Sequence, residues 1–304
     1  MNHFYVLLFL VNSMFGFSQE ELLKSAIEDI TEGEITIKAG DTTKGKVWIL
    51  SGLSTIEEIL NKDDFSQVDK WKILGIKGDN FKKLVKYSTE EDSLWSIVWA
   101  NMARKTFDQL EKDHRNEIVL IHLNNSRRRL KDASINQGMR LKSALNFVRS
   151  NQMYALAYDL SKQLNEVSAD ELFALGNSYE QLGDSEKSQH YYQECLQVDS
   201  TNFDVNARLG TQRFDDAQLI YRIWKMNQPN SPGHGEQQEL PEGVSSEKYQ
   251  SLLVESEMYL ERLYDSNQAN VEIMETLLKV YDGLGKSAEF SALKLELDTI
   301  KNEK

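Results

Sequence analysis

The chain has a single cysteine, Cys195, and only three prolines in 304 residues. An internal disulfide is therefore excluded, and stability must come from packing. The prolines, at positions 229, 232 and 241, fall in one segment. Elsewhere the chain can form long helices without the cost of about 3 kcal/mol of an interior proline. The sequence also lacks the common phosphate-binding glycine loops, so an ATPase or a dinucleotide enzyme is unsupported.

Basic residues are scarce relative to acidic ones: 35 lysines and arginines face 48 aspartates and glutamates, for a formal net charge of −13. This balance repels nucleic-acid phosphates, so we expect no nucleic-acid partner. One stretch is basic and holds a single acid, Asp132. Its basic residues are Arg127, Arg128, Arg129, Lys131, Arg140, Lys142 and Arg149. We interpret it as a solvated helix face paired with acidic neighbours rather than a binding patch.

The first residues have the pattern of a cleavable secretory signal. The apolar run Phe4–Val11 has 8 residues, where a membrane-spanning helix needs roughly 20. A polar break follows, and then the small-x-small triplet Gly16–Ser18. We expect cleavage after Ser18, which leaves a mature chain that begins at Gln19, has no membrane span and is periplasmic or secreted.

The clearest helical pattern lies in Ala169–Ser200, where apolar residues recur at helical spacing before and after a break at Gly183-Asp184. The segment resembles a tetratricopeptide repeat, a signature of about 34 residues. The residues that match are Leu172, Leu175, Gly176, Tyr179, Ser188, Tyr192 and Ser200. Small residues at Gly176 and Ser188 would let two antiparallel helices approach closely.

One such repeat cannot bury its own apolar faces, so neighbouring repeats are required. Downstream, Leu209-Gly210 lies 34 residues after Leu175-Gly176. An apolar stripe then predicts one long helix to about Met226, and Ser246–Tyr264 is its expected partner. In the tail, Tyr281 and Gly285 keep the spacing of Tyr179 and Gly183.

The resemblance implies an all-α fold: a tetratricopeptide-repeat solenoid of stacked antiparallel helix pairs in a right-handed superhelix, with degenerate repeats in the N-terminal part. We divide the chain into a signal peptide (1–18), an N-terminal helical region (19–137) with an insert at 61–91, a weak repeat (138–168), a repeat (169–202), a repeat with an inserted linker at 227–244 (203–268), and a C-terminal repeat with a capping helix (269–304). We expect a hairpin or irregular structure in the insert, where Gly75 and Gly78 occur, and a break at Ser150–Gln152 in the weak repeat.

Residues capable of chemistry do not form a recognisable site. No histidine has metal-ligand spacing, and His190 and Cys195 project about 140° apart on one helix, which disfavours a nucleophile–base pair. Cys195 is expected in the core. The carboxylate runs Asp63-Asp64 and Glu90–Asp92 are typical of helix caps or solvated loops. We therefore predict no catalytic residue, no metal and no cofactor.

Five tryptophans could stack on sugars, but Trp95 and Trp99 share a helix face, which first indicates a core. We assign Trp48 to a degenerate first helix. Trp71 is the least explained of the five, because its surroundings are polar. The remaining one, Trp224, belongs to the apolar stripe that ends at Met226.

In resembling repeats, the first helix of each pair lines a concave groove. Carried onto this sequence, its groove positions are Asp170, Phe173, Asn177, Glu180, Asp204, Ala207, Thr211, Phe214, Glu272, Glu275, Lys279 and Asp282. Six of these twelve are acidic, one is lysine and two are phenylalanine. The groove therefore favours a basic or amphipathic protein or peptide.

The resemblance implies a non-catalytic scaffold or adaptor that binds a protein or peptide. Two alternatives stay open: a carbohydrate- or substrate-capturing accessory protein with a site around Trp48 and Trp71, and an enzyme whose site lies in 61–91. A pocket of converging polar groups in the N-terminal half would favour the alternatives. Continuous helix pairs there would disfavour them.

Export predicts a defined N terminus. When the protein is expressed with its own first residues in a secreting host, we expect the product outside the cytoplasm to begin at Gln19. Edman degradation or intact mass measures this. A chain that stays in the cytoplasm and keeps residues 1–18 would contradict the prediction.

Overall fold

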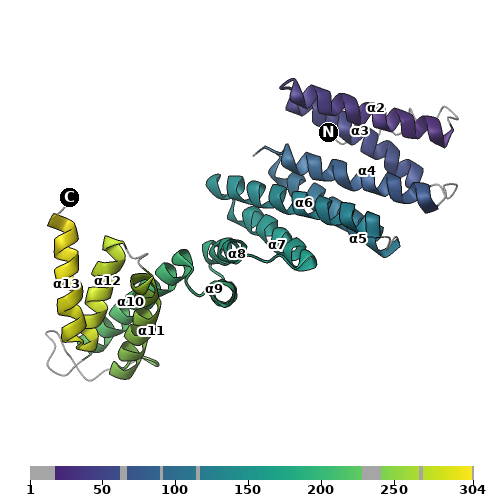
Figure 1. Ribbon diagram of the computed structural model, residues 1–304. Coiled ribbons are helices and arrows are strands. Elements are labelled where there is room, and N and C mark those ends of the chain that lie inside the picture. Colours follow the sequence, from purple (N-terminus) through teal and green to yellow (C-terminus); the bar gives the residue numbers. More distant parts are fainter. Residues whose placement is uncertain are drawn as a thin grey trace. The chain divides into compact units, whose positions relative to one another are not determined.

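The computed structural model describes residues 18–61, 67–89, 92–113, 117–227, 241–266 and 270–302, and all regular structure in these residues is helical (Figure 1). The helices are α2 (Gln19–Lys38), α3 (Thr42–Leu60), α4 (Gln67–Lys86), α5 (Ser93–Asp113), α6 (Glu117–Ser143), α7 (Phe147–Leu164), α8 (Ala169–Gln181), α9 (Ser185–Val198), α10 (Phe203–Met226), α11 (Ser246–Asp265), α12 (Val271–Leu284) and α13 (Ser287–Asn302). The predicted all-α fold is confirmed. Residues 1–17 of the predicted signal and 228–240 of the predicted linker lie outside the described residues.

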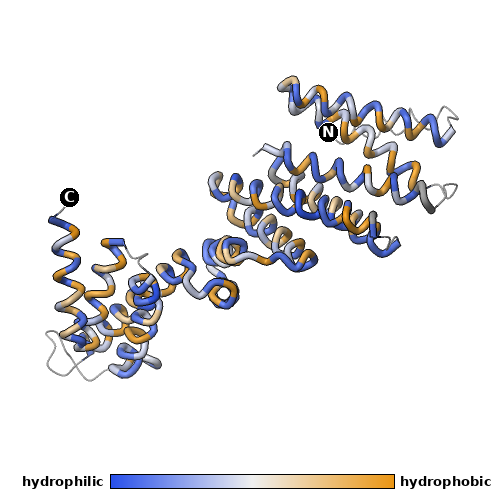
Figure 2. The backbone as a smooth tube through the Cα atoms, in the orientation of Figure 1, coloured by the Kyte–Doolittle hydropathy of each residue, from blue (hydrophilic) through white to orange (hydrophobic). Residues whose placement is uncertain are grey.

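The chain divides into two compact units, Met1–Ser188 and Gln189–Lys304. In the first, α2 pairs with α3, α4 with α5 and α6 with α7. In the second, α10 pairs with α11 and α12 with α13. Apolar residues recur in short stretches along the helices, with hydrophilic residues between them (Figure 2). Consecutive helix pairs are the organisation of a tetratricopeptide-like solenoid. A single right-handed superhelix through both units stays a prediction.

The first pair is held at backbone contact by glycines. A Cβ on Gly45 of α3 would lie 2.5 Å from the carbonyl oxygen of Gly33 on α2, and one on Gly33 would lie 2.6 Å from that of Gly45. A Cβ on Gly52, two turns along α3, would lie 2.5 Å from the carbonyl oxygen of Ala26. No other residue fits at these positions without moving a backbone. The close approach lets isoleucines such as Ile49 become fully buried between the helices.

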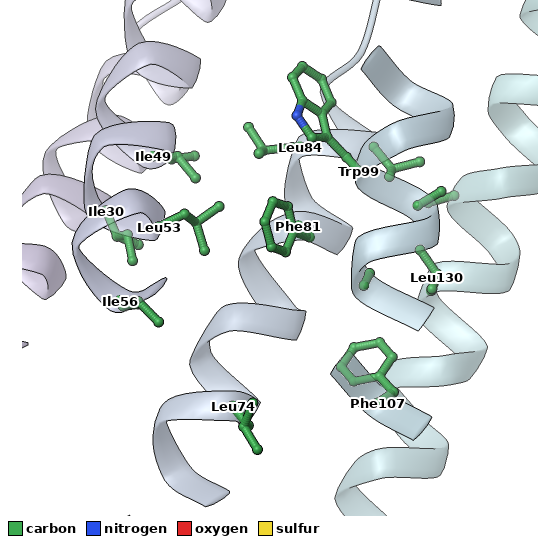
Figure 3. Packing of buried hydrophobic residues seen from close by; sticks show 14 of the residues in the cluster. Ile30, Ile49, Leu53, Ile56, Leu74, Phe81, Leu84, Trp99, Phe107 and Leu130 are labelled. Carbon is green, nitrogen blue, oxygen red and sulfur yellow. The ribbon is translucent and has the colours of Figure 1, made fainter. Parts of the chain in front are cut away.

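The core of the first unit runs from α2 to α7. Figure 3 shows Ile49 and Leu53 of α3 facing Phe81 of α4, with Trp99 and Leu130 beyond them on α5 and α6. All five are almost fully buried. Burying such side chains supplies roughly 1.5–3 kcal/mol each, which the helical spacing of the apolar residues makes possible.

The expected hairpin or irregular insert at 61–91 is wrong, because residues 67–86 form α4. Leu74, Phe81 and Val85 bury one side of this helix. Its glycines do not mark a turn. A Cβ on Gly78 would lie 2.4 Å from the ring of Phe107, so this glycine admits an aromatic ring from α5, whereas a Cβ on Gly75 would meet nothing within 4 Å.

The expected break at Ser150–Gln152 is also misplaced. The turn lies at 144–146, where Leu145 adopts a positive φ of 58° and Asn146 caps α7. Ser150 and Asn151 are buried inside α7. The hydroxyl of Ser150 donates to the carbonyl of Gly138 at 2.8 Å, and the Asn151 amide donates to Ser178 at 2.8 Å. These polar side chains join helices, and so their polarity gave a false turn signal.

The second unit follows its predicted pattern closely. Helix α10 continues to Met226, as expected. A Cβ on Gly210 would lie 2.4 Å from a methyl of Leu260, and the hydroxyl of Ser256 donates to the Gly210 carbonyl at 2.7 Å. The Leu-Gly pair therefore marks a close helix crossing. Gly183 and Gly285 both end helices with positive φ, 77° and 71°, which explains their matching positions.

The glycine contacts predict opposite effects for two similar substitutions. Gly45→Ala should lower the free energy of unfolding by about 1–3 kcal/mol, because its methyl overlaps the α2 backbone. The control, Gly75→Ala, should raise it by about 0.5–1 kcal/mol, because alanine favours the helix and space is open. Urea denaturation measures both. Equal stability of Gly45→Ala and the wild type would mean that the α2–α3 contact is dispensable.

Candidate functional site

Four of the predicted groove residues form one face of α8: Asp170, Phe173, Asn177 and Glu180. Their spacing places them on the same side of the helix, and we refer to them as the α8 face. Ser168 caps the helix by accepting from the backbone N–H of Glu171. Asp170 is exposed and the other three are half-buried. The α8 face therefore offers two carboxylates and an aromatic ring at the surface of the first unit.

Helix α6 supplies positive charge beside α8. The Lys142 ammonium donates to Asn177 at 2.7 Å, and Lys131 pairs with Glu171 at 3.2 Å. Nearby, Arg128 pairs with Glu166 at 2.6 Å, and this hydrogen bond lowers the pKa of that carboxyl. The acidic partners expected for the basic stretch are confirmed.

Arg127, from the same stretch, does not belong to a solvated face. Its side chain is 2% exposed and pairs with Asp108 and Glu111 of α5, at 3.0 and 2.7 Å. The expectation is wrong for this residue, because α6 is covered by neighbours on more than one side. Arg127 joins α6 to α5, since a buried arginine needs carboxylate partners.

The other eight predicted groove residues lie in the second unit, four on α10 and four on α12, and these helices pack against each other. Thr211 and Phe214 are half-buried, and Phe214 packs against the core. Lys279 is exposed. Glu275 pairs with Lys301 of α13 at 2.6 Å, and the hydrogen bond lowers the pKa of Glu275. The carboxylate of Glu275, which a ligand would meet here, is therefore already paired with Lys301.

The residues weighed for chemistry have structural positions. Cys195 is fully buried, as predicted, and His190 lies 3.5 Å from Glu194. Asp92 pairs with Lys46 and accepts from Thr89. Burial alone would raise its pKa, but these bonds outweigh it and the pKa is lowered. Asp63-Asp64, Glu90-Glu91, His114 and His234 lie outside the described residues.

The core interpretation of the tryptophans is correct for Trp99, which is 4% exposed, and wrong for Trp95, which is 43% exposed. Their rings stack at 6.4 Å between centroids. Trp95 lies in the first turn of α5 beside exposed Leu94, where no helix covers it among the described residues. Trp48 is also partly exposed at 36%, and Trp71 and Trp224 are half-buried.

Two cavities open on the first unit. One, of about 470 Å³, is lined largely by polar side chains, among them Glu57, Lys70 and Lys77. The other, of about 630 Å³, lies between α4 and α6 and is mainly apolar, with Trp71 in its wall. Sequence reasoning missed this cavity because it assigned no helix to 67–86. The helical spacing of Trp71, Gly75 and Asp79 was the available signal.

None of the helices described is long and apolar enough to cross a membrane. Within the same residues, no group of three or more histidine, cysteine, aspartate or glutamate side chains is placed to hold a metal ion.

Comparison with known proteins identifies the repeat. A family model described as "Tetratricopeptide repeat" matches residues 172–202, which cover α9 and most of α8. This region is the one whose residues resemble the signature most closely. The chain thus contains a tetratricopeptide-type helical repeat, which supports a protein–protein interaction scaffold. No curated protein matches the sequence.

Three solved structures match most of this chain at low sequence identity. The assembly chaperone of RpL4 (Acl4) is 15% identical, with 88% of this chain and 86% of that one covered and a TM-score of 0.38. BtubC from P. vanneervenii is 14% identical over 94% and 92%, with a TM-score of 0.37. The designed helical repeat protein DHR64 is 11% identical over 94% and 100%, with a TM-score of 0.22. The fold assignment rests on the described helices and on the repeat match.

The Glu275–Lys301 pair predicts a pH effect. Lys301→Ala should raise the pKa of Glu275, because the carboxylate loses its hydrogen bond, and Lys279→Ala should raise it less. In the wild type, the lowered pKa gives stability that is present above the unfolded-state pKa of glutamate and lost as the pH falls through the folded-state value. NMR titration of the side-chain carboxyl measures the shift. An unchanged pKa in Lys301→Ala would mean that the pair does not persist in solution.

Proposed function

We propose that the protein is a non-catalytic scaffold or adaptor, exported to the periplasm or beyond the cell, that binds a protein or peptide through the α8 face. The observation that carries the proposal is the tetratricopeptide repeat over residues 172–202. Its first helix presents Asp170 and Glu180 around Phe173, at the positions that line the groove in resembling repeats. Helical repeats use such surfaces to hold partners.

The chemistry of the α8 face favours a partner that brings lysine or arginine beside an apolar anchor. An aromatic side chain at a surface supplies contact area, and complementary charges around it set orientation and specificity. Because these carboxylates are partly exposed, binding should weaken as salt rises. The residues on α10 and α12 extend the same proposal to the second unit.

Export rests on the pattern of the first 18 residues. Helix α2 begins at Gln19 with Ser18 as its N-cap, in a capping box with Glu21. Cleavage after Ser18 would remove that cap, which typically costs about 1 kcal/mol. The first turn of the mature chain would then be less stable than that of the precursor. The α2–α3 contact at Gly33 and Gly45 lies further along the helices than this first turn.

The helix pairing of the N-terminal half supports a scaffold over the accessory-protein and enzyme alternatives. Its described residues form the successive pairs α2–α3, α4–α5 and α6–α7, and α4 occupies the segment suggested for an enzyme site. Continuous helix pairs disfavour both alternatives, whereas the polar cavity lined by Glu57, Lys70 and Lys77 is the feature of this half that would favour them.

The test compares partner capture by the wild type and by the double variant Phe173→Ala, Glu180→Lys. Partners from the exporting cell, identified by mass spectrometry, should bind the double variant at least about tenfold more weakly, since it loses the anchor and reverses a charge. The matched control is Val198→Ala, Glu186→Lys, at exposed positions on α9. Circular dichroism checks folding. A folded double variant that keeps every partner would refute binding through the α8 face.

A further inference from the structure

The apolar cavity between α4 and α6 has the form of a groove. Its α4 wall is a stripe at one-turn spacing, Trp71, Gly75 and Asp79, with Ile76 beside it, and Phe107 and Leu110 of α5 form the floor. Figure 3 shows Phe107 between α4 and α6. Its volume of about 630 Å³ is within the range of roughly 300–1,000 Å³ that is usual for ligand pockets.

Gly75 makes the groove accessible along its length. A Cβ at this position would meet nothing within 4 Å, so the middle of the α4 wall has no side chain and no covering group among the described residues. From Trp71 to Asp79 the wall rises about 12 Å, or two helical turns. A partner helix can therefore place two or three apolar side chains in the groove.

Both walls of the groove are basic in an acidic chain. Helices α4 and α6 each carry six lysines and arginines against two acids, a formal charge of +4 apiece, whereas the whole chain is at −13. Outside the groove, several of these charges are paired: Lys77 with Glu57, Lys83 with Glu34, and Arg128 with Glu166.

Inside the groove, the positive charge of Arg129 is not neutralised by a described residue. Arg129 and His122 line it from α6, and both are exposed and form no ion pair with another described residue. Lys72 lines it from α4. The one acid among the described lining residues, Asp79, already pairs with Lys82 and accepts from Ser126 at 2.8 Å. The charge complementary to this rim is negative.

We propose that the α4–α6 groove binds an acidic amphipathic helix of a partner protein. The partner's apolar side chains enter over Gly75 toward Phe107 and Leu110, and its carboxylates lie along the rim beside Arg129. The site goes beyond the proposed function, because it is in a different part of the first unit from the α8 face and selects a ligand of opposite charge. A scaffold with both surfaces can hold two unlike partners.

The probe is a display library of helices of about 16 residues, long enough to form a helix on a surface. Apolar residues are randomised at i, i+3, i+4 and i+7, and the outer positions are randomised between glutamate and lysine. Selection on the full-length protein should enrich glutamate. The best peptide, labelled with fluorescein, is then titrated by anisotropy, and its affinity should fall as salt rises.

Two variants locate the binding. Gly75→Phe places an aromatic ring in the groove, at a position where a Cβ meets nothing within 4 Å. Arg129→Glu reverses the charge at the rim of the groove. Each variant should bind the selected peptide at least about tenfold more weakly than the wild type does. The control Lys24→Glu, at an exposed residue of α2, should stay within about twofold of the wild type. Thermal melting confirms that each variant folds.

Other outcomes overturn the proposal. Enrichment of lysine, no enrichment, or binding unchanged in Gly75→Phe would each exclude an acidic helix in this groove. Loss of binding in Phe173→Ala, Glu180→Lys would assign the peptide to the α8 face instead. A dimer in sedimentation that Gly75→Phe abolishes would show that a second copy occupies the groove. None of these results depends on whether the α8 face captures its own partner.

Discussion

The architecture depends on the close approach of paired helices at small residues. Gly33, Gly45 and Gly52 bring α2 and α3 to backbone contact, and Gly210 of α10 makes room for the side chain of Leu260 on α11. Gly78 admits the ring of Phe107 into the α4–α5 pair. Close packing matters here because the chain has no disulfide and has to gain its stability from buried apolar area.

Electrostatics adds a second set of connections, with α6 at their centre. Arg127 is buried against two carboxylates of α5, and Lys131 and Lys142 contact α8. A buried arginine without its partners would be strongly unfavourable. The basic stretch therefore holds neighbouring helices in register rather than attracting an outside ligand. Within this stretch of described residues, Arg129, which lines the α4–α6 groove, is the residue available to bind a partner.

The two proposed surfaces follow from this arrangement. On α8, carboxylates surround an aromatic ring, whereas between α4 and α6 basic side chains rim an apolar floor. Surfaces of opposite sign on one scaffold exclude each other's ligands, since like charges brought together at an interface cost several kcal/mol. Charge distribution thus gives the proposed scaffold a means of choosing and orienting partners.

The sequence by itself determined the helical class, the repeat at 172–202 and the extent of α10, because 3.6-residue periodicity and glycine at helix ends are local signals. Tertiary structure decided the rest. Gly75 and Gly78 had the appearance of a turn, and their helix forms because Phe107, distant in sequence, packs on one of them. Ser150 and Asn151 likewise bond to other helices. The α4–α6 groove needs three helices at once, and no local pattern contains that juxtaposition.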